Sequence, residues 1–113
     1  MNFPPADEIK TLSPLILAHI GDAYFHLYVR TRLLEVTHNV TRLHDLSAAI
    51  VSATAQAKTY RAIENSLTDA ERDIFRRGRN AKSHAPRKAT VAEYHASTGF
   101  EALLGSLYLS EQN

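Results

Sequence analysis

Residues 13–35 read SPLILAHIGDAYFHLYVRTRLLE, and their apolar side chains recur with the period of a helix. Ser13 before Pro14 is a typical start, because Ser caps the free N–H groups of a first turn and Pro has no N–H to leave unpaired there. The wide apolar face predicts a mostly buried helix that ends near Glu35. Gly21 inside this helix costs about 1 kcal/mol relative to Ala, which indicates that another backbone packs closely at this point.

The middle of the chain predicts two more helices. Thr41 can cap the first of them, in which Leu43 and Ile50 lie on one apolar face. Ser52 can cap the second, because residues 53–65 are rich in good helix formers.

Two capping boxes predict the last two helices. In a capping box, a Ser or Thr side chain and a Glu side chain three residues later each accept a hydrogen bond from the other's backbone N–H. Thr68 with Glu71 begins a short helix that Gly78 ends, and Thr90 with Glu93 begins a long apolar helix. The chain has neither the alternation of strands nor a tight hairpin motif, so the sequence predicts an all-α fold.

The composition limits the classes of protein to consider. The 113 residues leave room for one domain, residues 1–113, and the absence of Cys excludes a disulfide scaffold, a thiolate nucleophile and a zinc finger. The start, MNFPPADEIK, lacks the basic and apolar regions of a secretory signal, and no apolar run approaches the ~20 residues of a membrane span. We therefore expect a cytoplasmic protein with no membrane partner.

The net charge of +1 hides a strongly basic segment. Residues 76–88, RRGRNAKSHAPRK, hold six of the thirteen Lys and Arg residues and no acid, and residues 79–89 are predicted to form a loop. Such a block is typical of a surface that binds a polyanion, most often a nucleic acid, although a solvated loop without a partner has the same composition. Four of the six cations are Arg, whose planar side chain suits phosphate, which favours binding.

Two carboxylates stand inside apolar helices. Asp22 lies in LAHIGDAYF and Glu101 in TGFEALLG, and each has small neighbours that would let two helices cross closely. A carboxylate on a buried face costs several kcal/mol unless it is paired or binds a metal. Two carboxylates that share a site repel each other unless a hard cation such as Mg²⁺ lies between them. The sequence thus offers Asp22 and Glu101 as a candidate metal pair.

Two other interpretations of these residues remain open. The acids could be structural and form salt bridges with local arginines such as Arg30 or Arg32. Alternatively, His19, Asp22 and His26 share one helix face and could form a transition-metal site. The transition-metal site is disfavoured, because seven residues of helix span ~10 Å, too far for both histidines to reach one ion together with the aspartate.

Four segments resemble the Mini-III branch of the ribonuclease III family. They are IGDAYFHLYVR (20–30), AAIVSATAQAK (48–58), RRGRNAKS (76–83) and STGFEALLG (97–105), in an order and spacing that match from about Leu15 to Leu109. The GDA or EALLG motif alone would be weak, but the combination with RGRNAKS between them is specific.

The resemblance implies a ribonuclease III-type helical endonuclease domain, without a separate double-stranded-RNA-binding domain. Members of this branch work as homodimers, cleave double-stranded RNA with Mg²⁺ and trim the precursor of large-subunit ribosomal RNA. The aspartate of the GDA motif and the glutamate of the EALLG motif bind the metal and are catalytic, and here they are Asp22 and Glu101. The basic segment would contact RNA through the following residues: Arg76, Arg77, Arg79, Asn80 and Lys82.

The chain also departs from the larger enzymes of the family. Those enzymes have acids four and seven residues before the GDA aspartate and three residues before the EALLG glutamate, where this chain has Ala18, Leu15 and Thr98. This poverty in acids is typical of the Mini-III branch, and it means that water and RNA phosphate must supply other ligands of the cation. His26 stands where many relatives have an acid.

Two non-enzymatic functions compete with this prediction. The same fold could serve as a non-catalytic double-stranded-RNA-binding or ribosome-assembly module, although the presence of both Asp22 and Glu101 argues against that. The chain could also be a helical interaction domain with an idle basic loop. Incubation with a long RNA duplex, with Mg²⁺ or with a chelator, distinguishes these functions.

Overall fold

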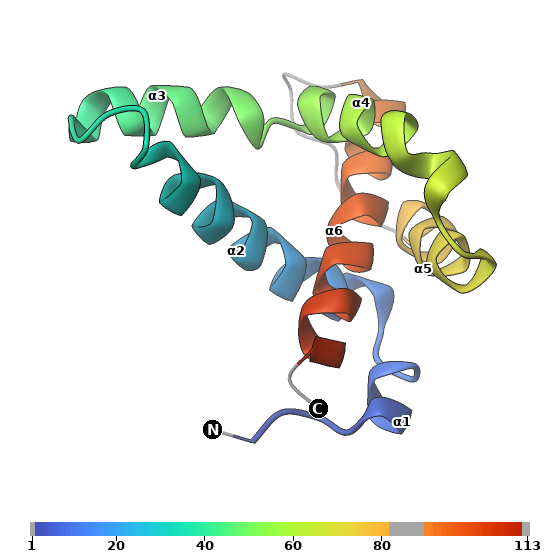
Figure 1. The fold of residues 1–113 in the computed structure, drawn as a ribbon. Coiled ribbons are helices and arrows are strands. Elements are labelled where there is room, and N and C mark those ends of the chain that lie inside the picture. The colour runs from blue at the N-terminus through green and yellow to red at the C-terminus, as the bar shows by residue number, and fades with distance from the viewer. Residues whose placement is uncertain (1, 82–89, 112–113) are drawn as a thin grey trace.

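A computed structural model describes residues 2–81 and 90–111 of the chain (Figure 1). Over these two ranges the chain forms helices and turns and contains no strand, so the predicted all-α fold is confirmed. The helices are α1 (Ala6–Ile9), α2 (Pro14–Leu33), α3 (Val40–Ile50), α4 (Ala53–Ile63), α5 (Asp69–Arg79) and α6 (Val91–Glu111), with a single 3₁₀ turn η1 (Glu64–Ser66) between α4 and α5.

Most of the predicted helix starts are confirmed by their hydrogen bonds. The Ser13 side chain accepts from Leu15 N at 3.2 Å, and both predicted capping boxes form. The start of α3 differs, because the Asn39 side chain accepts from Arg42 N at 2.9 Å and so caps the helix ahead of Thr41. Asn ranks above Thr as an N-cap, and the helix begins at Val40.

The predicted end of α5 at Gly78 is wrong. The helix continues through Gly78 to Arg79, and no described Gly has a positive φ. Gly78 is present for a different reason: a Cβ atom there would lie 2.9 Å from Ala102 Cβ and 2.9 Å from Gly99 Cα. The short helix α1 was also missed, because its four residues are too few for a periodic signal, although it buries Ile9.

Helix α6 is the central element and packs against α1, α2, α4 and α5 (Figure 1). Its apolar residues contribute to two buried clusters. The first cluster consists of Ile9, Leu17, Ala18, Ala102 and Leu109. The second consists of Tyr60, Phe75, Phe100 and Leu103, with the rings of Tyr60 and Phe75 stacked 3.4 Å apart. The core therefore lies around α6, and the apolar character of this helix is explained by burial on several sides.

Helices α2 and α6 cross through their backbones. A Cβ atom on Gly21 would lie 1.7 Å from the carbonyl oxygen of Glu101, and one on Gly105 would lie 1.9 Å from the carbonyl oxygen of Leu17. Neither position can hold any side chain without separation of the helices. The close backbone approach predicted at Gly21 is confirmed, and we call this contact the acid crossing because Asp22 and Glu101 flank it.

Helix α5 crosses α6 on a different set of residues. Gly78 faces Gly99 and Ala102, and the backbone carbonyl of Arg79 accepts a hydrogen bond of 2.9 Å from Nδ1 of His95. We call this contact the arginine crossing, because it fixes the end of α5 that carries Arg79 to α6.

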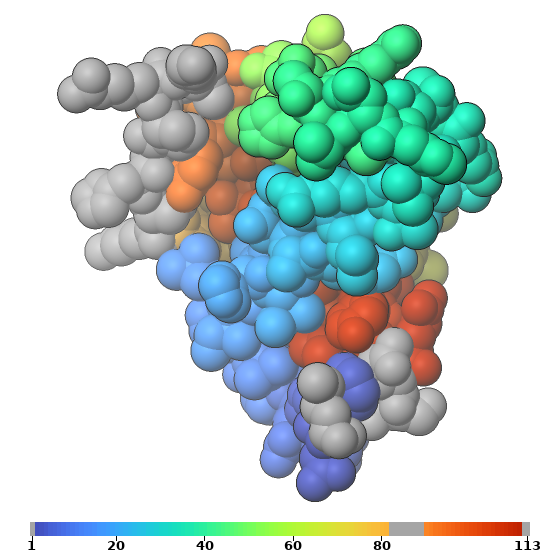
Figure 2. Space-filling model, turned by 90° about the vertical axis from the view of Figure 1, so that its left-hand side faces the viewer, coloured from blue at the N-terminus to red at the C-terminus, as the bar shows by residue number. Residues whose placement is uncertain are grey.

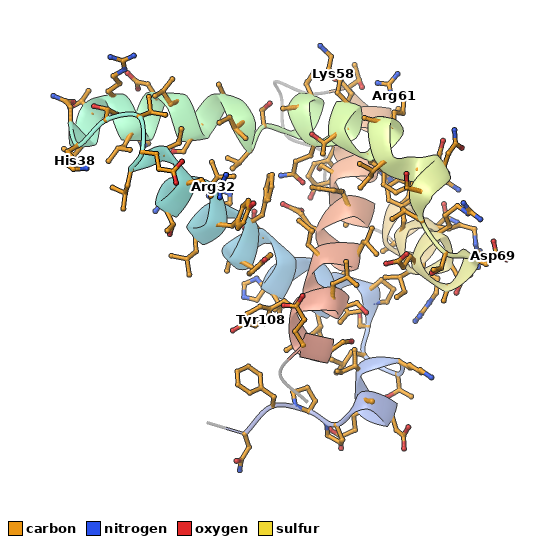
Figure 3. The ribbon with its side chains drawn as sticks, in the orientation of Figure 1. Arg32, His38, Lys58, Arg61, Asp69 and Tyr108 are labelled. Atoms are coloured by element: carbon orange, nitrogen blue, oxygen red, sulfur yellow. The ribbon has the colours of Figure 1, made fainter. Side chains whose placement is uncertain are left out.

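The C-terminal half of α2 and α3 form a hairpin that extends away from α6, with Arg32 and His38 on it (Figure 3). The prediction that α2 is mostly buried is wrong, because only four of its 20 residues, Leu17, Ala18, Gly21 and Val29, are buried among the described residues. Leu27 is 67% exposed and Tyr28 is 50% exposed. Figure 2 shows α2 and α3 forming the surface of this side of the molecule. None of the helices in the described ranges is long and apolar enough to cross a membrane.

Candidate active site

Asp22 and Glu101 come together at the acid crossing. Asp22 directly follows Gly21 on α2, and the carbonyl that packs on Gly21 belongs to Glu101 itself. The two side chains line the same cavity, and each is a neighbour that affects the charge of the other. The structure therefore brings together the two acids that the sequence singles out, from positions 79 residues apart in the chain.

The two acids have different surroundings. The Asp22 side chain is 52% exposed, so the expectation that it lies on a buried face is wrong, and Glu101 is the more buried of the pair. Burial, a hydrogen bond with Asp22 and the charge of Asp22 raise the pKa of Glu101 to about 8, and a hydrogen bond from Gln56 opposes this shift. Without a cation, these surroundings favour the protonated form of Glu101.

A third polar side chain, Gln56 on α4, contacts the pair and was missed in the sequence. Gln56 is 2% exposed, and its Nε2 donates to Glu101 Oε2 at 3.3 Å and to the carbonyl of Val51 at 2.9 Å. Residues 53–65 indicate only a good helix. A polar residue one helical turn before the buried Tyr60 was the signal that could have identified it.

These side chains line a cavity of about 360 Å³. Its wall includes Leu15, Ala18 and Thr98, the positions at which the resemblance implies acids in the larger enzymes of the family. Among the described residues, the wall presents two carboxyl side chains, Asp22 and Glu101, and the amide side chain of Gln56. Two neighbouring carboxyl groups fit a hard divalent cation, which takes oxygen ligands and retains several waters.

The histidines do not complete a metal site with Asp22. Nε2 of His26 lies 3.1 Å from Asp22 Oδ1, one helical turn away, and His19 lines the cavity. Across residues 2–81 and 90–111, no group of three His, Asp or Glu side chains is placed to hold an ion, so the three-ligand alternative is not supported. In the same ranges Asp22 forms no ion pair with Arg30 or Arg32, so the structural alternative also lacks its predicted contact.

Comparison with known protein families identifies the family to which this chain belongs. The pattern of the ribonuclease III domain matches residues 15–112, which include both acids and the cavity. The chain belongs to the ribonuclease III family. The resemblance seen in the four sequence motifs is confirmed.

Curated relatives give a narrower group within the ribonuclease III family. The chain is 53% identical to the Mini-ribonuclease 3 of Symbiobacterium thermophilum, over 90% of this chain and 80% of that protein. It is 44% identical to the Mini-ribonuclease 3 of Staphylococcus aureus, over 94% of this chain and 82% of that one. A crystal structure of a Fusobacterium nucleatum protein superimposes with a TM-score of 0.83 at 35% identity, covering 88% of this chain and 83% of that one. The chain is an endoribonuclease of the ribonuclease III type.

Four of the five predicted RNA-binding residues, Arg76, Arg77, Arg79 and Asn80, lie at the C-terminal end of α5. Arg79 places its guanidinium carbon 5.9 Å from the centre of the Phe75 ring, and its Nε lies 3.4 Å from Asn80 Oδ1. Arg76 forms an ion pair with Asp73, and Arg77 is half-buried in a cavity beside Ile74. Asn80 is the C-cap of α5. Lys82 lies outside the described residues, as does most of the predicted loop 79–89.

Proposed function

We propose that this endoribonuclease requires Mg²⁺ and cleaves double-stranded RNA, in maturation of the large-subunit ribosomal RNA precursor in the cytoplasm. The observation that carries the metal requirement is the placement of Asp22 and Glu101 in the wall of one cavity, beside the contact of Gly21 with the Glu101 carbonyl. Two carboxylates this close cannot both be ionised at low cost without a cation, and nothing else in the described surroundings supplies a positive charge to Glu101.

Asp22 and Glu101 would hold the Mg²⁺ ion, and the ion would activate water and stabilise the leaving oxygen in phosphodiester hydrolysis. Glu101 must give up its proton for this role, since a carboxylate is the ligand form. The hydrogen bond from Gln56 favours the ionised form of Glu101, and His26 beside Asp22 restricts the orientation of that side chain. Two carboxyl side chains of the described residues line the cavity, so water and an RNA phosphate would supply the other ligands.

The double-stranded RNA substrate is supported by the arginine crossing. Arg77 and Arg79 form no ion pair with the described residues, so both charges are available to phosphates, and Asn80 can bond to a 2′-hydroxyl. Arg76 is the weakest of the candidates, because Asp73 already neutralises it. The ribosomal substrate is supported by the likeness to the Mini-ribonuclease 3 proteins, together with the resemblance of the four motifs to the Mini-III branch.

We also propose a homodimer. The exposed apolar residues of α2 border a groove of about 410 Å³ that contains Ile20, Tyr24, Leu27 and Tyr108. Tyr108 projects from α6 toward α2, and its ring lies 5.1 Å from that of Tyr24 (Figure 3). An apolar surface of this kind is suited to burial against a second copy, and a two-fold dimer would present two sites to the two strands of one duplex.

A cleavage assay on a long RNA duplex tests the proposal. We expect cleavage with Mg²⁺ and none with a chelator. Asp22→Asn and Glu101→Gln should each lower the rate roughly 1,000-fold, since a lost metal contact removes several kcal/mol of transition-state stabilisation and each 1.36 kcal/mol is a factor of ten. Asp45→Asn, which changes an exposed acid on α3, is the matched control and should retain full activity.

Three results would count against this function. Full activity of Glu101→Gln would remove the acid pair from the mechanism. Cleavage that continues in the chelator would remove the cation. Binding of the duplex without cleavage, with Mg²⁺ present, would favour the non-catalytic RNA-binding module.

A further inference from the structure

The two polar atoms of the Gln56 amide differ in their contacts. Its Nε2 donates both to Glu101 Oε2 and to the Val51 carbonyl, whereas its Oε1 is buried and accepts no hydrogen bond from any other residue that the structure describes. A buried amide oxygen without a donor costs free energy, so the fold retains this orientation against a penalty. This orientation is explained by the two hydrogen bonds that the amide N–H groups donate.

The Val51 carbonyl fixes which way the amide faces. Val51 is the C-cap of α3, where helix carbonyls lack a partner within the helix, and Gln56 Nε2 supplies the donor at 2.9 Å. A carbonyl can only accept, so a flipped amide would place two oxygens against each other at Val51. The second N–H therefore points at Glu101 whatever state that side chain is in.

We propose that Gln56 is a positioning residue, held by the Val51 carbonyl, that keeps the Glu101 carboxylate against Asp22 for a divalent cation. The inference rests on the proposed binding of the cation by Asp22 and Glu101. A fixed N–H donor restricts rotation of the Glu101 side chain within the cavity. Gln56 acts through Glu101 and touches neither RNA nor the ion in this proposal.

Binding of Mn²⁺ alone to the full chain, without RNA, tests the proposal. Mn²⁺ prefers the same oxygen ligands as Mg²⁺ and its free fraction is measured by electron paramagnetic resonance. Gln56→Met keeps the length of the side chain and removes both N–H donors. We expect its dissociation constant for Mn²⁺ to rise roughly 10- to 100-fold, the range for loss of a hydrogen-bond partner of a metal ligand.

A double-substitution cycle separates positioning from packing. In a Glu101→Gln background, Gln56→Met should change the remaining Mn²⁺ affinity less than twofold, because the group it acts through is gone. Any loss of thermal stability that Gln56→Met causes through packing, measured in chelator, should instead be similar with and without Glu101→Gln. Ser97→Ala is the matched control: Ser97 lines the same cavity but donates to Tyr94 O of its own helix at 2.7 Å, and its loss should leave Mn²⁺ binding unchanged.

A second measurement on the unsubstituted chain covers the case in which Gln56→Met does not fold. The side-chain N–H resonances of Gln56 should shift when Mg²⁺ is added, and the shift should vanish in Glu101→Gln. An unchanged Mn²⁺ dissociation constant in Gln56→Met, equal weakening in both backgrounds, or resonances insensitive to Mg²⁺ would overturn the role of Gln56. If the unsubstituted chain itself binds no Mn²⁺, the proposed metal requirement fails instead.

Discussion

The acid crossing and the arginine crossing each use a glycine on α6, but the backbones approach each other more closely at the acid crossing. At the acid crossing a Cβ atom would meet carbonyl oxygens at 1.7 and 1.9 Å, whereas at Gly78 the nearest atoms are carbons 2.9 Å away. The second contact is also close, since a Cβ atom on Gly99 would lie 2.6 Å from the Phe75 carbonyl oxygen, but it is less close than the first. The tighter crossing holds the two acids, whose separation must be fixed, and the looser one holds arginines, which reach their ligand with long side chains.

The largest expected effect is on the acid crossing. Gly21→Ala would place a methyl group on the Glu101 carbonyl, so α2 and α6 must separate along their whole contact. We expect a loss of more than about 4 kcal/mol in the free energy of unfolding, or no folded protein, measured by urea denaturation followed by circular dichroism. A stable Gly21→Ala protein would show that the crossing is not limited by the backbone.

Gly78→Ala should have a smaller effect. The added methyl would lie 2.9 Å from both Ala102 Cβ and Gly99 Cα, so α5 and α6 must move apart there, but by less than the 1.7 Å approach at Gly21 would require. We expect a cost of about 1–3 kcal/mol in the same urea experiment, with cleavage activity retained in the folded protein. If Gly78→Ala cost as much as Gly21→Ala, the proposed difference between the crossings would be wrong.

The acid crossing also predicts a pH dependence of stability in the absence of a cation. Because the pKa of Glu101 is raised from 4.5 to about 8, the folded chain binds a proton more tightly than the unfolded chain. This contribution to stability is full below pH 4.5 and is lost as the pH rises through about 8.

Urea unfolding in chelator at several pH values measures this loss as a difference. Subtraction of the same curve for Glu101→Gln, which cannot titrate there, removes the contribution of all other groups. The difference should fall between pH 4.5 and 8, and saturating Mg²⁺ should reduce the fall, since the ion favours the carboxylate. A flat difference would mean that the raised pKa of Glu101 does not couple to folding.

The smallest effect is expected at the arginine crossing. Arg79→Ala should weaken duplex binding a few-fold and make the salt dependence shallower by about one unit of log K per unit of log salt, because one phosphate contact is lost. Arg76→Ala on the same helix should change the slope less, since Asp73 already pairs with that cation. Equal slopes for the unsubstituted chain and Arg79→Ala, measured between 50 and 200 mM salt by fluorescence anisotropy, would argue against contact with phosphate.

Much of the fold could be predicted, because its signals are local. Capping residues such as Ser13, Ser52 and Thr68 act on backbone N–H groups two or three residues away, so the sequence alone contains both partners. Gly78 shows the limit of such signals. The same residue ends helices and permits close helix crossings, and only the position of α6 distinguishes the two uses.

The candidate site likewise contains residues that the sequence alone reveals and one residue that it does not. Asp22 and Glu101 could be found because each is an acid within an apolar helix, which is visible along the chain. Gln56 could not be assigned, because its importance depends on where the first turn of α4 lies relative to Glu101 and to the end of α3. The exposure of α2 was missed for a related reason: an apolar face predicts burial but does not say against what.

The contact of Gly21 with the Glu101 carbonyl has a consequence for anyone who wishes to redesign this enzyme. Because main-chain atoms fix the distance between α2 and α6, the gap between the two acids cannot be widened by exchanging side chains around it. Attempts to alter metal choice should leave both helices untouched and vary α4. Gln56 of α4 approaches the two acids through its side chain, which can be replaced on its own.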